Sequence, residues 1–274
     1  MNMNRIIILI GALTLLIVTL GCIGSTQEKT AVSSIPGPTE TVSKIDVSSL
    51  SLPDNFKSLS DGLKLIPPGI SWAYFTNLKQ ATGLEESTLP ETDFYGTQII
   101  GMLNSEYSEN SWIELHDLGR SVSGVQSKAG ADVDNILYTR PFIYSTKDRT
   151  GSVMALMKEQ GNATAYNTYE SILEEVDDES AGYAKIELEA PSFANASYIG
   201  LISSGNDVIG EIAFSIKDKA VVPRQTYDNL KNSSSGRGFR SYDITMQNNT
   251  LIIRMTSNLD NVVSEVSRNY GITI

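Results

Sequence analysis

Glu114 and His116 are the residues whose types and spacing most directly suggest chemistry. They lie two positions apart in the stretch Trp112 to Asp117, and His116 is the only histidine among 274 residues. Residues two apart in a strand share a face, so this carboxylate and imidazole could share a proton or a metal ion. Zinc normally takes three or four protein ligands. As a candidate metal site the pair would therefore need a distant acidic residue as well, and the alternative is a polar strand face that includes a histidine.

A cationic segment from Lys217 to Arg240 is the second candidate. It holds six basic residues and two acidic ones, in a chain whose net charge is −11. The loop Gly236 to Gly238 could offer backbone donors beside guanidinium groups to a carboxylate, sulfate or phosphate. The expected anion-binding residues are Arg224, Lys231, Arg237 and Arg240. The alternative is an ordinary soluble loop between a helix and a strand.

Other reactive groups do not combine into a catalytic pattern. A serine nucleophile would need a histidine partner, and no G-x-S-x-G turn accompanies the single imidazole. The acidic run Glu174 to Glu179 offers oxygen ligands of the kind calcium prefers, but its spacing does not match a calcium-binding loop. We therefore expect no cofactor and favour a non-enzymatic protein. A hydrolase using paired carboxylates, or a metal at Glu114 and His116, remains an alternative.

Six aromatic residues form a further candidate surface, because flat rings offer stacking faces to a glycan or a peptide. The alternative is that these rings belong to the core. The residues are Trp72, Tyr74, Phe75, Tyr138, Phe142 and Tyr144.

The N-terminus has the parts of an export signal. Arg5 precedes an apolar run from Ile6 to Leu20, and Gly21 and Cys22 follow it directly. Cys22 is the only cysteine in the chain. With Gly21-Cys22 at this position, the first 25 residues or so resemble prokaryotic lipoproteins, bacterial or archaeal. The resemblance implies that residues 1–21 are removed and that Cys22 becomes a lipidated N-terminus. The alternative is a signal that stays uncleaved as an anchor.

The chain beyond Cys22 divides by composition. Residues 22–51 are rich in Ser, Thr and Pro and lack aromatic residues, so we predict a solvated tether. We predict a globular domain over residues 52–274, with a possible division into two subdomains near residue 160. With a single cysteine, no intramolecular disulfide can stabilise that domain. Its acidic balance disfavours nucleic acid as a partner.

Apolar periodicity predicts an α+β fold. Strand signals with period 2 and helix signals with period 3.6 alternate along the C-terminal half. Hairpins imply an antiparallel or mixed sheet, with helices packed on one face. We expect strands at 70–76, 95–103, 112–118, 184–190, 198–203, 208–217, 242–246 and 251–255, and helices within 52–66, 169–176, 224–231 and 259–266.

Together these patterns predict a membrane-anchored protein displayed on the external side, whether extracellular or periplasmic. The first hypothesis is a non-catalytic module that binds a small anionic ligand or an envelope protein. The second is a structural or assembly subunit of the envelope, and the hydrolase comes third.

Overall fold

The computed structural model describes residues 52–81, 84, 99–120, 133–136, 140–158, 163–188 and 190–274. At 133–136, 157 and 158 only the backbone is described. The signal, Cys22 and the tether predicted for residues 22–51 lie outside the described residues. Residues 44–274 form one compact unit, and all described residues belong to it.

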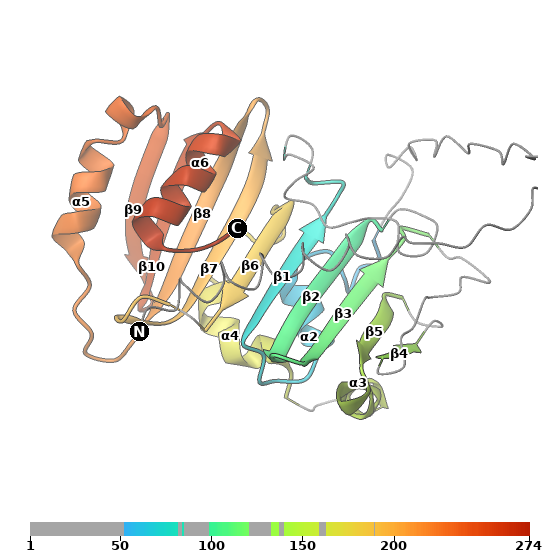
Figure 1. Cartoon of the computed structure of the whole chain (residues 1–274). Coiled ribbons are helices and arrows are strands. Elements are labelled where there is room, and N and C mark those ends of the chain that lie inside the picture. Colours follow the sequence, from blue (N-terminus) through green and yellow to red (C-terminus); the bar gives the residue numbers. More distant parts are fainter. Residues whose placement is uncertain are drawn as a thin grey trace, which may run out of the picture. The chain divides into compact units, whose positions relative to one another are not determined.

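The described chain builds one antiparallel sheet of ten strands (Figure 1). The strands are β1 Trp72–Asn77, β2 Gly101–Ser108, β3 Ser111–Asp117, β4 Val133–Ile136, β5 Phe142–Thr146, β6 Tyr183–Glu187, β7 Ala194–Ser204, β8 Asp207–Ile216, β9 Ser241–Gln247 and β10 Thr250–Ser257. The helices are α2 Leu59–Lys64, α3 Lys147–Lys158, α4 Ala165–Leu173, α5 Arg224–Asn232 and α6 Leu259–Glu265, with a 3₁₀ turn η4 Ser235–Arg237 and a π turn η5 Val266–Tyr270.

The sheet consists of two halves with the same connectivity. Its order is β4-β5-β3-β2-β1-β6-β7-β8-β10-β9. The first half runs α2, β1, β2, β3, then edge strand β4 and β5, which returns to pair with β3; the second runs α4, β6, β7, β8, then edge strand β9 and β10, which returns to β8. The first strands of the halves, β1 and β6, pair at the centre, where Tyr74 lies opposite Lys185. The described chain therefore has an internal structural repeat, whose halves join between α3 and α4.

One face of the sheet is covered by α2, α3 and α4. Leu59 and Leu63 of α2 and Ile172 of α4 are essentially unexposed, and they pack with Phe75 and Tyr198 from the sheet. Burial of each such aliphatic side chain stabilises the folded domain by roughly 1.5–3 kcal/mol relative to leaving it exposed. The largest core of the described residues therefore lies on this face.

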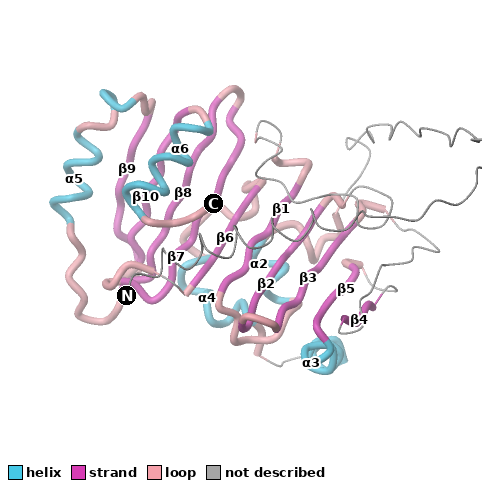
Figure 2. Tube along the Cα trace, viewed as in Figure 1, coloured by secondary structure: helices cyan, strands magenta, loops and turns pink. Residues whose placement is uncertain are grey.

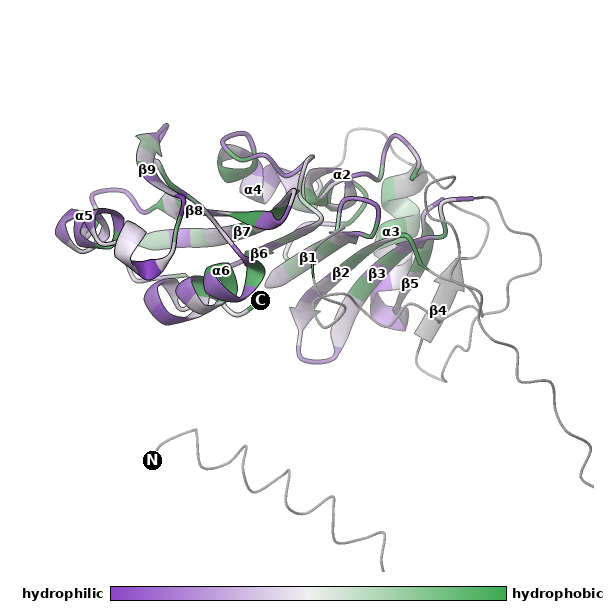
Figure 3. Ribbon diagram, turned by 90° about the horizontal axis from the view of Figure 1, so that it is seen from above, coloured by the Kyte–Doolittle hydropathy of each residue, from purple (hydrophilic) through white to green (hydrophobic). Residues whose placement is uncertain are grey.

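The opposite face is covered by α6 over the second half of the sheet. Val262 and Val266 pack with Ile212, Ile253 and the neighbouring apolar residues of β7, β8 and β10. Figure 3 shows α2 and α4 above the sheet and α6 below it. The α+β class and the antiparallel sheet are confirmed, but the helices lie on both faces, which differs from the expected single covered face. The reason is that β7 and β10 carry large apolar residues on both of their sides, and β8 carries them on the side toward α6.

Turn residues fix the two C-terminal hairpins as expected. Asn248 and Asn249 have φ of 42° and 65°, and Gly205 has φ of 64°. Consecutive left-handed residues suit the right-handed twist of a tight hairpin, and Asn tolerates that conformation. The resulting registers pair Ile253 with Ile244 and Ile212 with Ile199.

Other bounds differ from the expectations in the first half. The predicted strand at 95–103 is displaced, because the described strand runs from Gly101 to Ser108, and residues 95–98 lie outside the described part. The turn between β2 and β3 consists of two residues, Glu109 and Asn110. β4, β5 and α3 were not predicted. Figure 2 shows them together at the edge of the first half.

Candidate functional site

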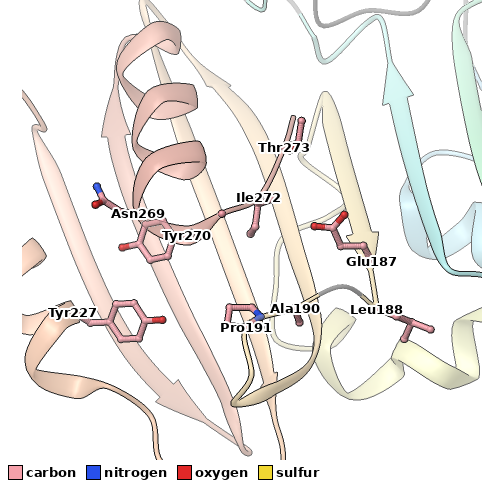
Figure 4. A pocket seen from close by; sticks show the side chains of 10 residues that line it. Glu187, Leu188, Ala190, Pro191, Tyr227, Asn269, Tyr270, Ile272 and Thr273 are labelled. Carbon is pink, nitrogen blue, oxygen red and sulfur yellow. The ribbon is translucent and has the colours of Figure 1, made fainter. Parts of the chain in front are cut away.

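A pocket of about 700 Å³ lies beside the C-terminal segment (Figure 4). Its lining comes from the end of β6, the following loop, α5, and the stretch after α6. Tyr227 and Tyr270 lie on one side, and Glu187 and Thr273 on the other. The complete lining is Glu187, Leu188, Ala190, Pro191, Tyr227, Asn269, Tyr270, Gly271, Ile272 and Thr273.

Two tyrosine rings form one wall of the pocket. The ring centroids of Tyr227 and Tyr270 are 5.9 Å apart, with planes 14° from parallel. Burial raises the pKa of Tyr227 to about 12, and burial, with Tyr242 adding to it, raises the pKa of Tyr270 further. Both phenols therefore stay protonated at neutral pH. Both residues offer ring faces, and Tyr227 also carries a hydroxyl group that can donate a hydrogen bond.

A buried hydrogen-bond chain holds Tyr270 in place. The Tyr242 hydroxyl donates to Glu265 Oε1 over 2.9 Å, and the hydroxyls of Tyr242 and Tyr270 are hydrogen-bonded to each other. Because the single proton of Tyr242 goes to Glu265, Tyr270 must donate to Tyr242. Arg237 then donates from Nη1 to the second oxygen of Glu265. This chain orients the Tyr270 ring toward the pocket.

The opposite wall is polar and is fixed by Lys185. Its Nζ lies 2.8 Å from Glu187 Oε2 and donates to the Thr273 carbonyl over 2.9 Å. The C-terminal segment is thus held against β6, on the face that α6 also covers. Glu187 keeps hydrogen-bonding capacity, since a carboxylate accepts about four hydrogen bonds.

The pocket suits binding better than catalysis. Its volume falls within the range of about 300–1,000 Å³ typical of small-molecule sites, and its lining combines polar groups with aliphatic and aromatic side chains. The lining contains no serine, cysteine or histidine, and Glu187 is its single acidic residue. The arrangement can hold the apolar or ring-shaped part of a ligand. Glu187 and Asn269 can accept hydrogen bonds from the polar groups of the same ligand.

Three of the four predicted anion-binding residues are paired with carboxylates. Lys231 Nζ lies 3.2 Å from Asp243, Arg240 Nη1 lies 2.6 Å from Asp207, and Arg237 pairs with Glu265. Arg224 is the first residue of α5 and is exposed. The structure does not bring the four cations onto a single anion, and the anion site stays a prediction.

Glu114 and His116 do lie together, as predicted from their spacing. Glu114 Oε2 is 3.0 Å from His116 Nε2, and Asn104 donates to Glu114 Oε1 over 3.1 Å. His116 is almost fully buried. Among the described residues no group of three or more possible metal ligands forms a site, so metal binding by this pair stays a prediction.

The acidic run at the end of α4 has a structural use at Asp178. This residue is 5% exposed, and its Oδ2 accepts the Ser60 backbone N–H over 2.7 Å. Burial raises the pKa of its carboxyl group, which the hydrogen bonds from Ser60 partly counter. Asp178 thus joins the start of α2 to the loop that follows α4.

The predicted aromatic surface is divided by the structure. Phe75 and Phe142 are buried in the core, while Trp72, Tyr74 and Tyr144 are partly exposed. Tyr138 lies outside the described residues. Sequence reasoning missed the lining of the pocket, because its residues come from three separate segments between Glu187 and Thr273. Tyr270 and Ile272, after the last predicted helix, are the apolar signal that could have indicated packing of this segment onto the domain.

Comparison with known proteins identifies no relative by sequence. No protein family matches the chain, and no curated protein matches it. Among solved structures, crystal forms III and I of TP0453, a Treponema pallidum protein, match at TM-scores of 0.45 and 0.46 and 9% identity. The matches cover 75% and 76% of this chain and 97% of the other. A likeness at this level carries no argument about ligand or activity.

The described helices are all too short or too polar to cross a bilayer.

Proposed function

We propose that this chain is an externally displayed lipoprotein whose folded domain is a non-catalytic binding module, with its ligand site in the pocket beside the C-terminal segment. The carrying observation is the pocket itself, with a stacked tyrosine pair on one wall and a fixed carboxylate on the other. Protonated phenols, a carboxylate and apolar side chains can select a ligand by hydrogen bonds and packing contacts. Membrane attachment is supported by the signal and Cys22 in the sequence.

A pocket-filling substitution tests the ligand site. Ala190 lines the pocket, so Ala190→Trp places an indole ring in the space that a ligand would occupy. Val221→Trp is the matched control, because Val221 is 88% exposed and lies outside the pocket lining. The full chain and both variants would be purified from the cells that make the protein, in mild detergent, and compared by native and denaturing mass spectrometry.

We expect wild type and Val221→Trp to carry a mass that denaturation releases, and Ala190→Trp to lack it. The indole would exclude the ligand sterically, whereas the control adds the same group elsewhere. A wild-type chain that releases no mass, or an Ala190→Trp variant that retains it, would contradict the proposal.

The lipid anchor has a separate test. Cys22→Ser removes the sulfur to which the lipid would be attached. We expect wild type to incorporate a fatty-acid label and to begin at residue 22, and the variant to be unlabelled and to retain residues 1–21. A labelled variant, or a wild-type protein that still carries its first 21 residues, would refute attachment at Cys22 and favour the uncleaved anchor.

A further inference from the structure

The sheet face that bears the pocket continues across the first half as a partly exposed, polar and aromatic surface. The strand register places its residues in two adjacent rows. One row reads Tyr144, Glu114, Asn104, Tyr74 and Lys185 across β5, β3, β2, β1 and β6, and the other reads Trp112, Glu106, Trp72 and Glu187 across β3, β2, β1 and β6. We call these nine residues the aromatic face.

All nine residues of the aromatic face are partly exposed. Trp72 and Tyr74 have ring centroids 5.8 Å apart, with planes 3° from parallel. The ring centroids of Trp112 and Tyr144 are 4.9 Å apart. The next row on the same face differs, since His116, Met102 and Phe142 are buried. Four accessible rings clustered on one surface are more typical of a binding site than of ordinary protein surface.

Hydrogen-bonding groups alternate with the rings. Glu106 lies between Trp72 and Trp112 in the register, and Asn104 with Glu114 lies between Tyr74 and Tyr144. Carboxylates and amides can bond to neighbouring hydroxyl groups, while ring faces contact apolar C–H surfaces. A sugar ring presents both kinds of group.

The charge of the aromatic face narrows the ligand class. It carries three carboxylates, Glu106, Glu114 and Glu187, and one ammonium group, Lys185, which is paired with Glu187. This balance repels polyanions. A neutral ligand rich in hydroxyl groups fits the charge and the donors and acceptors better than an acidic polymer.

The aromatic face and the pocket share Glu187. This residue lines the pocket and also lies opposite Trp72 in the β1–β6 ladder. From β6 to β5 there are four strand-to-strand steps of about 4.8 Å, which gives a length of about 19 Å. A ligand longer than the pocket can therefore continue over the rings without a break.

We propose that the aromatic face binds a neutral oligosaccharide, one end of which enters the pocket. This inference rests on the proposed function, because it assigns a ligand class to the same site. The rings hold the sugar units, and Glu106, Asn104 and Glu114 bond to their hydroxyl groups.

Chain length is the basis of the test. Calorimetric titrations would use the full chain in a detergent without a sugar headgroup, with cellohexaose, maltohexaose and chitohexaose and the disaccharide of each. Trp112 lies on β3, three strand-to-strand steps from β6, which carries Glu187. Trp112→Ala should therefore weaken hexasaccharide binding roughly tenfold and leave disaccharide binding unchanged. Trp112→Phe retains a ring and should recover most of the affinity. Near-UV circular dichroism and thermal melting would verify that each variant is folded.

The pocket variants separate this inference from the proposed function. Ala190→Trp should weaken both the hexasaccharide and the disaccharide, since it blocks the pocket end. If none of the hexasaccharides binds while the natural ligand mass persists, the oligosaccharide inference fails and the proposed function stands. Hexalysine tests whether the carboxylates select a cationic ligand instead, and its binding in place of every hexasaccharide would overturn the inference. Equal hexasaccharide affinity in Trp112→Ala and wild type would also overturn it.

Discussion

Two buried tyrosines allow a sharp test of how polar groups in this core determine stability. Tyr198 and Tyr169 are 0% and 1% exposed. The Tyr169 hydroxyl donates to the Ile70 carbonyl over 3.1 Å, whereas the Tyr198 hydroxyl has no hydrogen-bond partner among the described residues. Burial raises the pKa of both phenols, to about 12 for Tyr169 and well above its usual value for Tyr198. The hydroxyls are therefore protonated at neutral pH.

The same substitution should have opposite effects at the two sites. Tyr169→Phe removes a hydrogen bond and leaves the Ile70 carbonyl unpaired, which we expect to lower the free energy of unfolding by about 1–2 kcal/mol. Tyr198→Phe removes a buried hydroxyl that has lost its hydrogen bonds to water and makes none to the described residues. We expect it to raise the free energy of unfolding by about 1 kcal/mol, since an unsatisfied buried polar group costs roughly 1–3 kcal/mol and the lost packing of one atom offsets part of that.

Equilibrium unfolding in guanidinium chloride, followed by the fluorescence of Trp72 and Trp112, measures both effects. The slope of unfolding free energy against denaturant should be the same in all three proteins, so that differences in midpoint report stability. If Tyr198→Phe destabilises the domain as much as Tyr169→Phe does, the Tyr198 hydroxyl is hydrogen-bonded and the reasoning is refuted.

Two further predictions concern α6 and Asp178. A Cβ at Gly210 would lie 2.5 Å from Val262 of α6, so Gly210→Ala should destabilise the domain by about 1–3 kcal/mol. Gly151→Ala in α3, where a Cβ meets nothing within 4 Å, should stabilise it by about 0.5–1 kcal/mol; thermal melts that rank the two alike would contradict this packing. Asp178 has a raised folded pKa, so its contribution to stability is full below the unfolded value near 3.8 and falls as the pH rises. Asp178→Asn, which keeps an acceptor for the Ser60 N–H, should gain stability relative to wild type from about pH 4 upward, and a difference independent of pH would rule out this burial effect.

The sequence determined the elements that depend on nearby residues. The two C-terminal hairpins follow from period-2 patterns on each side of the Gly205 and Asn248-Asn249 turns, and α5 follows from its own helical pattern. The spacing of Glu114 and His116 likewise placed them on one face, because alternation along a strand is local. These features need only contacts between residues that are close in the chain.

Tertiary structure decided which faces are buried and which groups meet. Both faces of β7, β8 and β10 carry apolar residues, and only packing decides that α4 covers one face and α6 the other. Arg237, predicted to bind an anion, is neutralised by Glu265, 28 residues later, in a contact that no local pattern reveals. The pocket and the aromatic face arise in the same way, from strands brought together by long-range pairing. Side-chain types and periods are encoded locally, whereas sites depend on distances between segments that only the folded chain fixes.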